Sequence, residues 1–407
     1  MHILLIHQAF AALDDAGGTR HVELANYLAD HGHQITIISS PVNYLTGQSS
    51  QVKPRWIEKI EVRPGITLLR TYTYAALHRS FVHRVLAFLS FMVSSFLAGL
   101  QVKKVDFVWG TSPPIFQGIT AWLLARLKRV PFLFEIRDLW PAFAVAVGVL
   151  KSPILIKASL WLEKFLYRHA DRLVINSPGF LSHVTERGAR WVEIIPNGAN
   201  PKMFDPDCDG TAFRVAHSLG DDFIALYAGA HGLSNDLDVI LNSALKLKDQ
   251  PGIKIVLVGD GKEKKNLQAR AAQLNLTNIV FLPPVPKTEM AQTLAAANAC
   301  IAILMPLDLY KTTYPNKVFD YMAAGRPILL LIDGVIRQVV DAAEAGIFIQ
   351  PGDSDELADG IQALASDPAR ACQMGKNGRK YIENHFNRAT IAEQFRLLLE
   401  DMQRKNG

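Results

Sequence analysis

The stretch TTYPNKVFDYMAAGRPIL, residues 312–329, carries the sharpest local structural signal in this 407-residue sequence. Pro315 fits the first position of a helix, because proline lacks the N–H group that a helix start leaves unpaired. Gly325 fits the left-handed position just after that helix, and Pro327 forces the chain out into a strand. The stretch therefore predicts a short helix that is followed directly by a strand.

The start of this helix is a candidate anion site. The amides of Asn316, Lys317 and Val318 have no partner inside the helix, and its dipole favours negative charge there. Lys317 adds a full positive charge, and Asp320, one turn later, could hold a ribose diol. A solvated aspartate on a helix face is the alternative for Asp320. The combination favours a binding site for a phosphorylated ligand.

The alternation of strands and helices extends in both directions. Apolar runs separated by helical stretches indicate parallel sheets covered on both faces. A turn-rich stretch at residues 200–220 interrupts the alternation, which then restarts. We therefore expect an α/β protein of two doubly wound, Rossmann-like domains facing each other across a cleft. Residues 1–205, with residues 388–407 crossing back, form the first domain, and residues 206–387 form the second.

Other strand ends carry further candidate binding residues, because ligands of open parallel sheets bind at the carboxyl ends of the strands. Gly17 and Gly18 follow the first strand, and His231 follows the first strand of the second domain. Gly261 and Lys262 follow the next one. The alternatives are an ordinary turn for the two glycines and an exposed loop histidine for His231.

Composition excludes several classes of protein. The three cysteines are far apart, which excludes a disulfide framework and a CxxC zinc or redox site. The sequence contains no dinucleotide fingerprint, HExxH, GxSxG or P-loop motif. Four DxD patterns occur where aspartate caps well, so we expect no essential metal.

Charge is divided unevenly between the expected domains. Residues 1–205 carry 22 lysines and arginines against 14 aspartates and glutamates, whereas the remainder carries 21 against 24. A basic half indicates an anionic partner. Because no nucleic-acid motif accompanies the basic residues, we expect an anionic membrane surface and no nucleic acid.

Residues 81–100 predict a long helix with one apolar face, flanked by Lys103 and Lys104. The polar face carries His83, Arg84, Ser90, Ser94 and Gln101. The apolar face carries Phe81, Val85, Phe88, Leu89, Met92, Phe96 and Leu100. The continuous apolar run is too short to span a bilayer. The pattern fits a helix lying in the membrane interface as well as a helix covering the sheet.

From end to end, the sequence resembles family four of the retaining glycosyltransferases, which have the GT-B architecture. The specific marks are IPNGANPKMF, residues 195–204, and NKVFDYMAAGRPI, residues 316–328. The glycine loop at Gly17–Gly18 and VGDGKEK, residues 258–264, support the resemblance. EIRDLWP, residues 135–141, together with YPNKVFDYMAAGRP, residues 314–327, resembles the bacterial branch that builds O-antigen and capsule, including fucosamine-transferase-like enzymes.

The resemblance implies transfer of a sugar from a UDP-linked donor with retention at the anomeric carbon. The C-terminal domain would bind the nucleotide sugar, and the N-terminal domain a lipid-linked saccharide acceptor. The sugar would be an N-acetylated aminosugar, and the product a surface polysaccharide such as O-antigen or capsule. No cofactor is implied, and the expected location is cytoplasmic, peripheral on the inner face of the cell membrane.

The sequence departs from the family pattern at several site positions. Asp320 matches the second acid of the family's E-x7-E pair, the ribose contact, whereas Thr312 stands at the first. The usual Arg/Lys pair over the diphosphate is missing after the first strand of the second domain. We infer that Lys317, with Lys262, neutralises the charge. Arg137–Asp138 stands where relatives carry His–Asp, and is expected to contact the acceptor or the donor sugar.

The catalytic candidates are therefore Lys317, Asp138 and Arg137. Two other functions remain open from the sequence. One is a nucleotide-sugar epimerase with paired Rossmann-like domains. The other is a non-catalytic nucleotide-sugar-binding subunit of a polysaccharide assembly, which the Thr312 departure favours.

Overall fold

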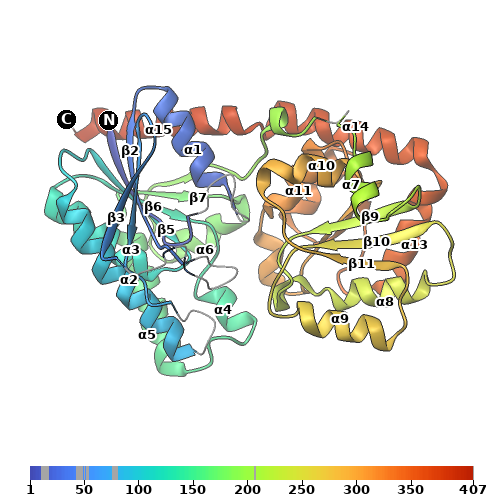
Figure 1. Ribbon diagram of the computed structural model, residues 1–407. Helices are drawn as coiled ribbons and strands as arrows, with labels where there is room; N and C mark the ends of the chain where they lie inside the picture. Colours follow the sequence, from blue (N-terminus) through green and yellow to red (C-terminus); the bar gives the residue numbers. More distant parts are fainter. Residues whose placement is uncertain are drawn as a thin grey trace. The chain divides into compact units, whose positions relative to one another are not determined.

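The computed structural model describes residues 1–10, 18–42, 49, 51, 55–75, 81–205 and 208–406 (Figure 1). These residues form two compact units. The first unit contains the described residues up to Pro196 together with the chain from Ala389 onward, and the second contains Asn197–Arg388. The chain thus changes unit at Pro196–Asn197, upstream of the expected residue 205, and changes back at Arg388–Ala389.

The first unit is built on an eight-stranded sheet of order β3-β4-β2-β1-β5-β6-β7-β8. All neighbouring strands are parallel except β3, which pairs antiparallel with β4 at one edge. The strands are β1 (His2–Ile6), β2 (Gln34–Ser39), β3 (Ile57–Arg63), β4 (Ile66–Thr71), β5 (Phe107–Ser112), β6 (Phe132–Ile136), β7 (Arg172–Ile175) and β8 (Val192–Ile194).

Helices cover both faces of this sheet (Figure 1). They are α1 (Arg20–Asp30), α2 (Phe81–Gln101), α3 (Phe116–Lys128), α4 (Ala142–Ala146), α5 (Pro153–His169), α6 (Leu181–Glu186) and the C-terminal α15 (Arg388–Asn406). α15 packs with α1 on one face, where Phe395 lies against Trp109 at a ring-centroid distance of 4.7 Å. The returning helix therefore completes the hydrophobic core of the first unit.

The second unit is built on a six-stranded parallel sheet of order β11-β10-β9-β12-β13-β14. Its strands are β9 (Phe223–Ala228), β10 (Ile253–Val258), β11 (Ile279–Leu282), β12 (Ala299–Ile303), β13 (Ile328–Leu331) and β14 (Gly346–Phe348). This is the 3-2-1-4-5-6 order of a Rossmann fold, with its reversal between β9 and β12. The predicted fold class, two Rossmann-like α/β domains, is confirmed.

Two layers of helices sandwich the second sheet. α8 (Asp238–Lys246), α9 (Lys264–Gln273) and α13 (Ser354–Ser366) share a core on one face. The other face packs against α10 (Met290–Ala295), α11 (Asn316–Ala323), α12 (Val335–Ala342) and α14 (Pro368–His385). α7 (Thr211–Ala216) lies at the edge of this second layer through its partly buried Phe213.

The predicted helix at residues 312–329 is α11, and its ends are well defined. It begins at Asn316, so Pro315 is the capping residue in extended backbone conformation rather than the first helical residue. Gly325 follows with φ of +67°, as expected, and its N–H donates to Met322 O. The Arg326 N–H reaches back to Tyr321 O, which completes the glycine cap before β13.

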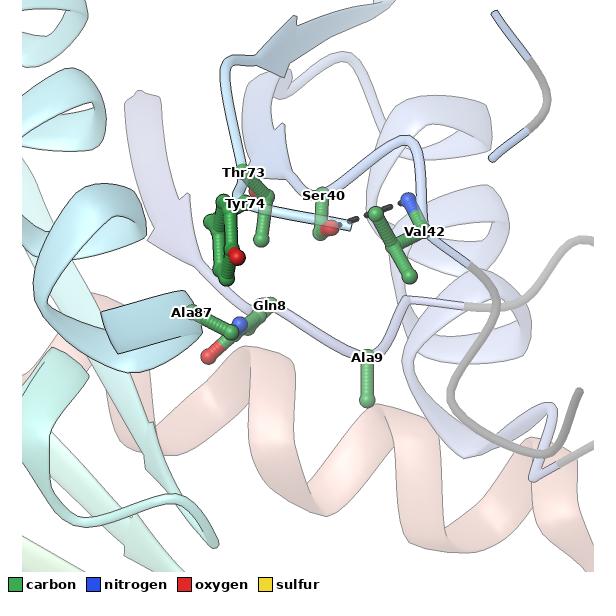
Figure 2. A pocket seen from close by; sticks show the side chains of 7 residues that line it. All are labelled: Gln8, Ala9, Ser40, Val42, Thr73, Tyr74 and Ala87. Atoms are coloured by element: carbon green, nitrogen blue, oxygen red, sulfur yellow. Dashed lines mark hydrogen bonds between the residues drawn. The ribbon is translucent and has the colours of Figure 1, made fainter. Parts of the chain in front are cut away.

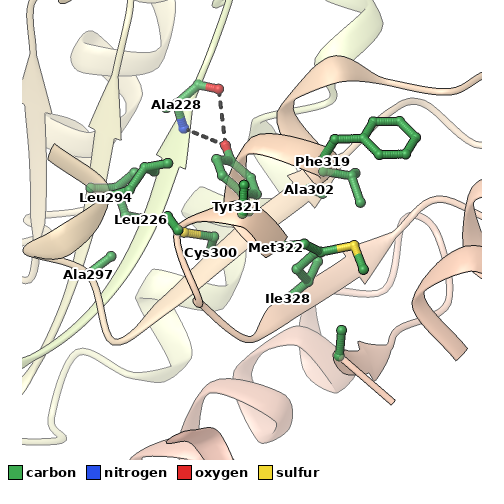
Figure 3. Close-up of a cluster of buried hydrophobic side chains, with 14 of the residues drawn as sticks. Leu226, Ala228, Leu294, Ala297, Cys300, Ala302, Phe319, Tyr321, Met322 and Ile328 are labelled. Atoms are coloured by element: carbon green, nitrogen blue, oxygen red, sulfur yellow. Dashed lines mark hydrogen bonds between the residues drawn. The ribbon is translucent and has the colours of Figure 1, made fainter. Parts of the chain in front are cut away.

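A hydrogen-bonded tyrosine fixes α11 to the end of β9 (Figure 3). The buried Tyr321 hydroxyl accepts the Ala228 N–H at 2.9 Å and donates to the Ala228 carbonyl at 3.1 Å. The surrounding core, which includes Leu226, Cys300 and Phe319, is fully buried. Because a buried hydroxyl must be satisfied, this pair of bonds sets where α11 starts relative to the sheet.

α2 forms as expected, but its faces differ from the expectation. Ser94 and Ser95 are buried, and the Ser94 hydroxyl donates to Tyr72 O at 2.6 Å. The Ser90 hydroxyl accepts the Tyr74 N–H at 2.9 Å. The serines therefore face inward, where they satisfy backbone groups at the exit of β4. The exposed face instead carries an apolar row: Val82, Leu86, Leu89, Val93, Leu97 and Leu100.

By length and composition, α2 is the one helix among the described residues that is long and apolar enough to cross a membrane. This corrects the expectation that the apolar run is too short. A third (33%) of the apolar window within Val82–Gln101 is buried, because its inner face packs on α3 and β4. α2 is thus a covering helix of the first unit whose outer row has no partner within the described residues.

The first unit also contains a buried charged cluster. Glu135 is fully buried and accepts hydrogen bonds from Arg20 Nε and His21 Nε2, both at 2.8 Å, and from Trp109 Nε1 at 3.1 Å. Burial alone would raise the pKa of Glu135, but His21 and Arg20 hold it well below its usual value. Arg20 also donates to Ile195 O and Pro196 O, so the cluster ties down the end of the first unit.

We expect Glu135→Gln to lower the free energy of unfolding by about 3 kcal/mol, because Arg20 would stay buried without its charged partner. A urea titration measures this loss. Glu61→Gln is the matched control, since Glu61 pairs with Lys59 on the exposed surface of β3 and its replacement should leave the midpoint nearly unchanged. Equal effects of the two substitutions would contradict a structural role for the buried pair.

Candidate functional site

The start of α11 and the end of β9 bring one lysine and several polar groups together in the second unit. Lys317 Nζ donates to the Tyr227 hydroxyl at 2.9 Å and to Asn235 Oδ1 at 3.4 Å. It also lies 4.0 Å from the centroid of the Tyr227 ring. Gly229 allows this approach, because a Cβ there would come within 2.8 Å of Nζ. The ammonium group is therefore held against the backbone at the sheet's reversal point.

Lys317 has no carboxylate among its hydrogen-bond partners in the described residues. Burial lowers the pKa of Lys317 to about 7. An anion placed beside it would restore the charge and raise this pKa again. A lysine so perturbed at the carboxyl edge of a Rossmann sheet is a strong candidate for an anion-binding group.

The amides at the start of α11 are only partly free. Within the described part of the chain, the N–H groups of Asn316 and Lys317 have no acceptor, whereas Val318 donates to Pro315 O at 3.2 Å. The prediction of a free amide at Val318 is therefore wrong, because the first turn closes onto the proline carbonyl. Asn316 Oδ1 is also buried without a partner. Two amides and Lys317 thus remain available to an anion.

His231 is completely buried, which contradicts the alternative of an exposed loop histidine. Both of its ring nitrogens lack a partner among the described residues. The backbone N–H of His231 donates to Asp260 O. A Cβ at Gly261 would lie 2.3 Å from His231 O, so only glycine fits at position 261. Burial is the main cause that lowers the pKa of His231 to about 4; Lys264 and Lys317 also lower it, and Asp260 opposes them. His231 is therefore neutral and lies beside the Lys317 cluster.

The neighbouring lysines have different roles from those expected. Lys264 donates to Gly259 O and Leu282 O at 2.7 and 2.8 Å, so its charge holds the loop after β10. Lys262 is exposed and has no partner within the described residues. Of the predicted site residues in this loop, Gly261 lies against His231, whereas Lys262 does not join the side chains around Lys317.

Asp320 lies one turn after Lys317, where its carboxylate accepts a hydrogen bond from Lys287 Nζ at 2.5 Å. Both side chains are largely buried. A ribose diol at Asp320 would therefore share the carboxylate with Lys287. Thr312, at the position of the family's first acid, donates to Leu309 O at 2.6 Å.

Four contributors to this site were not predicted from the sequence. Tyr227 and Asn235 hold the ammonium of Lys317, and Lys287 pairs with Asp320. The Tyr321 hydroxyl positions the helix itself. The only sequence signal for Tyr227 is its place at the end of a buried strand, and Lys287 belongs to no motif.

Three other predicted site residues, Gly18, Arg137 and Asp138, belong to the first unit. Gly17 lies outside the described residues, and a Cβ at Gly18 would meet nothing within 4 Å. Arg137 follows β6 and donates to Pro113 O at 3.0 Å, while Asp138 beside it is exposed. No group of three or more metal-ligating side chains occurs among the residues that the structure describes.

Comparison with known families assigns both units. Residues 16–198 match the family described as "Glycosyl transferase 4-like domain", and residues 211–381 match "Glycosyl transferases group 1". The chain is therefore a glycosyltransferase. It belongs to the glycosyltransferases of GT-B architecture that combine these two domains.

Relatives and solved structures agree with this class. The chain is 24% identical over 389 residues to the putative colanic acid biosynthesis glycosyl transferase WcaI of Escherichia coli, covering 92% of this chain and 93% of that protein. It is 26% identical over 406 residues to D-inositol 3-phosphate glycosyltransferase of Streptomyces avermitilis, covering 94% and 82%. The fold is similar to that of sucrose-phosphate synthase from Thermosynechococcus elongatus, with a TM-score of 0.80, 22% identity and 98% of each chain covered.

We expect Gly229→Ala to weaken binding of inorganic pyrophosphate at least about tenfold, because the new methyl group would displace the Lys317 ammonium. Isothermal titration calorimetry measures the affinity. Gly232→Ala, in the same loop, is the control: its Cβ would meet only Asn235 at 3.9 Å, so its affinity should match the wild type. Equal binding by all three proteins would show that the Lys317 cluster does not receive the diphosphate.

Proposed function

We propose that this enzyme transfers a sugar from a UDP-linked donor to a lipid-linked saccharide acceptor, with retention at the anomeric carbon. The observation that carries this proposal is the Lys317 ammonium without a carboxylate partner, set beside the free amides of Asn316 and Lys317. This arrangement suits a diphosphate leaving group, which carries negative charge and offers several acceptor oxygens.

The chemistry requires stabilisation of charge on the departing group. As the bond between the anomeric carbon and the phosphate oxygen breaks, negative charge grows on the diphosphate. Lys317 and the two amides are fixed before the reaction begins, and such a preorganised donor is worth about 3–4 kcal/mol in the transition state. The acceptor oxygen forms the new bond to the anomeric carbon, and its proton passes to the departing phosphate oxygen.

The names of relatives support a role in surface polysaccharide assembly. WcaI is named for colanic acid biosynthesis, and an O-antigen chain mannosyltransferase of Escherichia coli is 22% identical over 244 residues. A structure of similar fold, Anabaena HepE, was solved in complex with UDP-glucose. The names of the two Escherichia coli relatives support surface polysaccharide assembly. The N-acetylated aminosugar as the transferred group rests on the resemblance of EIRDLWP to fucosamine-transferase-like enzymes alone.

Because Lys317 titrates near neutral pH, the affinity for the donor should depend on pH. With a pKa of about 7, Lys317 loses its proton as the pH rises, and a diphosphate then loses its charged partner. We expect the Kd of UDP-glucose to rise at least about tenfold between pH 6.5 and 8.5. Lys317→Arg should flatten this dependence, because arginine stays charged. Lys317→Ala should also flatten it and reduce transfer or hydrolysis of the donor at least tenfold.

Calorimetry at several pH values measures the affinity, and circular dichroism confirms that the variants are folded. A pH dependence that persists in Lys317→Arg would assign the titration to another group. Wild-type turnover in Lys317→Ala would remove Lys317 from the mechanism.

The first unit supports a peripheral location on the membrane. The exposed face of α2 carries its apolar row over the length of the helix, from Val82 to Leu100. Lys103 and Lys104 follow directly and are exposed. An apolar row flanked by cations fits the interface of an anionic bilayer, where apolar side chains enter the headgroup region and lysines meet lipid phosphates. We infer that the lipid-linked acceptor is met at the inner face of the cell membrane.

We expect the double substitution Lys103→Glu and Lys104→Glu to reduce binding to vesicles at least about tenfold, since each lysine near an anionic surface contributes about 1 kcal/mol. Co-sedimentation with vesicles of phosphatidylcholine and phosphatidylglycerol measures binding. Lys376→Glu with Lys380→Glu, on the exposed surface of α14, changes the net charge equally and should have little effect. Equal loss in both double variants would mean that only net charge matters, not the α2 surface.

A further inference from the structure

The recess beside α2 in the first unit, which Figure 2 shows, is small. Its lining includes Gln8, Thr73 and Tyr74, and it has room for about one water molecule. A sugar or a nucleotide does not fit a recess of this size. In the second unit, by contrast, a buried contact connects IPNGANPKMF, residues 195–204, with the segment that leads into α11.

Asn197, the first residue of the second unit, is bonded to the residue that precedes Pro315. Its side-chain Nδ2 donates to Tyr314 O at 2.7 Å, and Asn197 is only 3% exposed. Because a carbonyl oxygen can only accept, the amide nitrogen and not the amide oxygen must face Tyr314. Asn197 Oδ1 is buried without a partner in the described part of the chain. The bond to Tyr314 is therefore what orients this side chain.

The Tyr314 carbonyl belongs to the peptide plane that leads into α11. Fixing this plane orients Pro315, whose extended backbone conformation caps the helix and whose carbonyl closes the first turn. The next two amides, of Asn316 and Lys317, are those without an acceptor among the described residues. Their direction follows from that of the first turn. The Asn197 bond therefore helps to set where the two free amides point.

The backbone beside Asn197 is itself held by the chain that leads back to the first unit. The backbone N–H of Ala199 donates to Phe386 O at 3.1 Å, and that of Arg388 donates to Ala199 O at 2.8 Å. The Phe386 ring also packs against Tyr314, at a centroid distance of 5.9 Å. Tyr314 is thus held by both segments in which the chain passes from one unit to the other.

The last residue of the motif supports a second part of the donor site. Phe204 is fully buried, and Lys287 Nζ lies 5.0 Å from the centroid of its ring. A cation over an aromatic face is attracted by the ring. Lys287 in turn donates to Asp320, one turn after Lys317. The motif therefore contacts both the start of α11 and the partner of Asp320.

We propose that Asn197 is a positioning residue for the donor: its amide N–H group holds the Tyr314 carbonyl and thereby aims the free amides of α11 at the diphosphate. This role rests on the proposed function, which supplies the diphosphate, but it assigns a task to a residue outside the Lys317 cluster. Since Asn197 acts by donating, a side chain of the same shape that only accepts should fail.

Two asparagine-to-aspartate substitutions in the same motif separate donating from accepting. Asn197→Asp replaces the donating group by an oxygen, which repels the Tyr314 carbonyl. Asn200→Asp is the matched control, because Asn200 Oδ1 accepts the Lys202 backbone N–H at 3.1 Å and a carboxylate can do the same. At pH 7.5, we expect Asn197→Asp to bind inorganic pyrophosphate at least about tenfold more weakly than wild type, and Asn200→Asp within about twofold. Isothermal titration calorimetry measures both affinities.

The pH profile distinguishes a lost donor from general damage to the fold. Burial raises the pKa of a carboxyl group, so Asn197→Asp is protonated at low pH and its O–H group can again donate to Tyr314. Its affinity for pyrophosphate, relative to wild type at the same pH, should therefore recover to within about threefold at pH 5. Asn197→Leu, which has no donor, should stay at least about fivefold weaker than wild type at both pH values.

Hydrogen–deuterium exchange of residues 314–324, without ligand, reports on α11 independently of the donor. Exchange should be faster in Asn197→Leu than in wild type and unchanged in Asn200→Asp. Wild-type exchange in Asn197→Leu, or equal affinities of the two aspartate variants at pH 7.5 when the wild type binds pyrophosphate, would overturn the role of Asn197. A wild type that binds neither pyrophosphate nor UDP-glucose, with exchange as expected, would refute the proposed function and leave Asn197 as the residue that positions α11.

Discussion

The ammonium group of Lys317 is held at the end of β9 by the ring and hydroxyl of Tyr227 rather than by a carboxylate. This position depends on two other features. The Tyr321 hydroxyl bonds both backbone groups of Ala228 and thereby fixes α11 to the strand, and Gly229 leaves room for the lysine. A buried cation without an anionic partner is unfavourable until a ligand supplies the charge. In the proposed function, the diphosphate of the donor supplies this charge.

Much of this arrangement could be predicted from the sequence, because it is encoded locally. Proline before a helix, glycine after it and an apolar run beyond it predicted α11, its glycine cap and β13. The repeated alternation of strands and helices predicted two Rossmann-like units. Local signals were wrong only in detail: Pro315 caps the helix instead of starting it, and its carbonyl takes up the Val318 amide.

What the sequence could not provide were pairings between distant segments. Lys287 donates to Asp320 from 33 residues earlier in the sequence, and the Lys264 ammonium donates to backbone carbonyls. The periodicity of α2 located a helix, but its serines face inward because the exit of β4 lies there. His7 Nδ1 lies 2.9 Å from the Thr111 hydroxyl, which is 104 residues away in the sequence. Such partners become visible only when the fold brings the segments together.

A crystal structure of the protein with bound UDP would test the role of Lys317 most directly. The expected result is a diphosphate whose oxygens lie within hydrogen-bond distance of Lys317 Nζ and of the amides of Asn316 and Lys317. Phosphates bound elsewhere in the second unit, or held by a divalent cation with Lys317 still on Tyr227, would contradict this role.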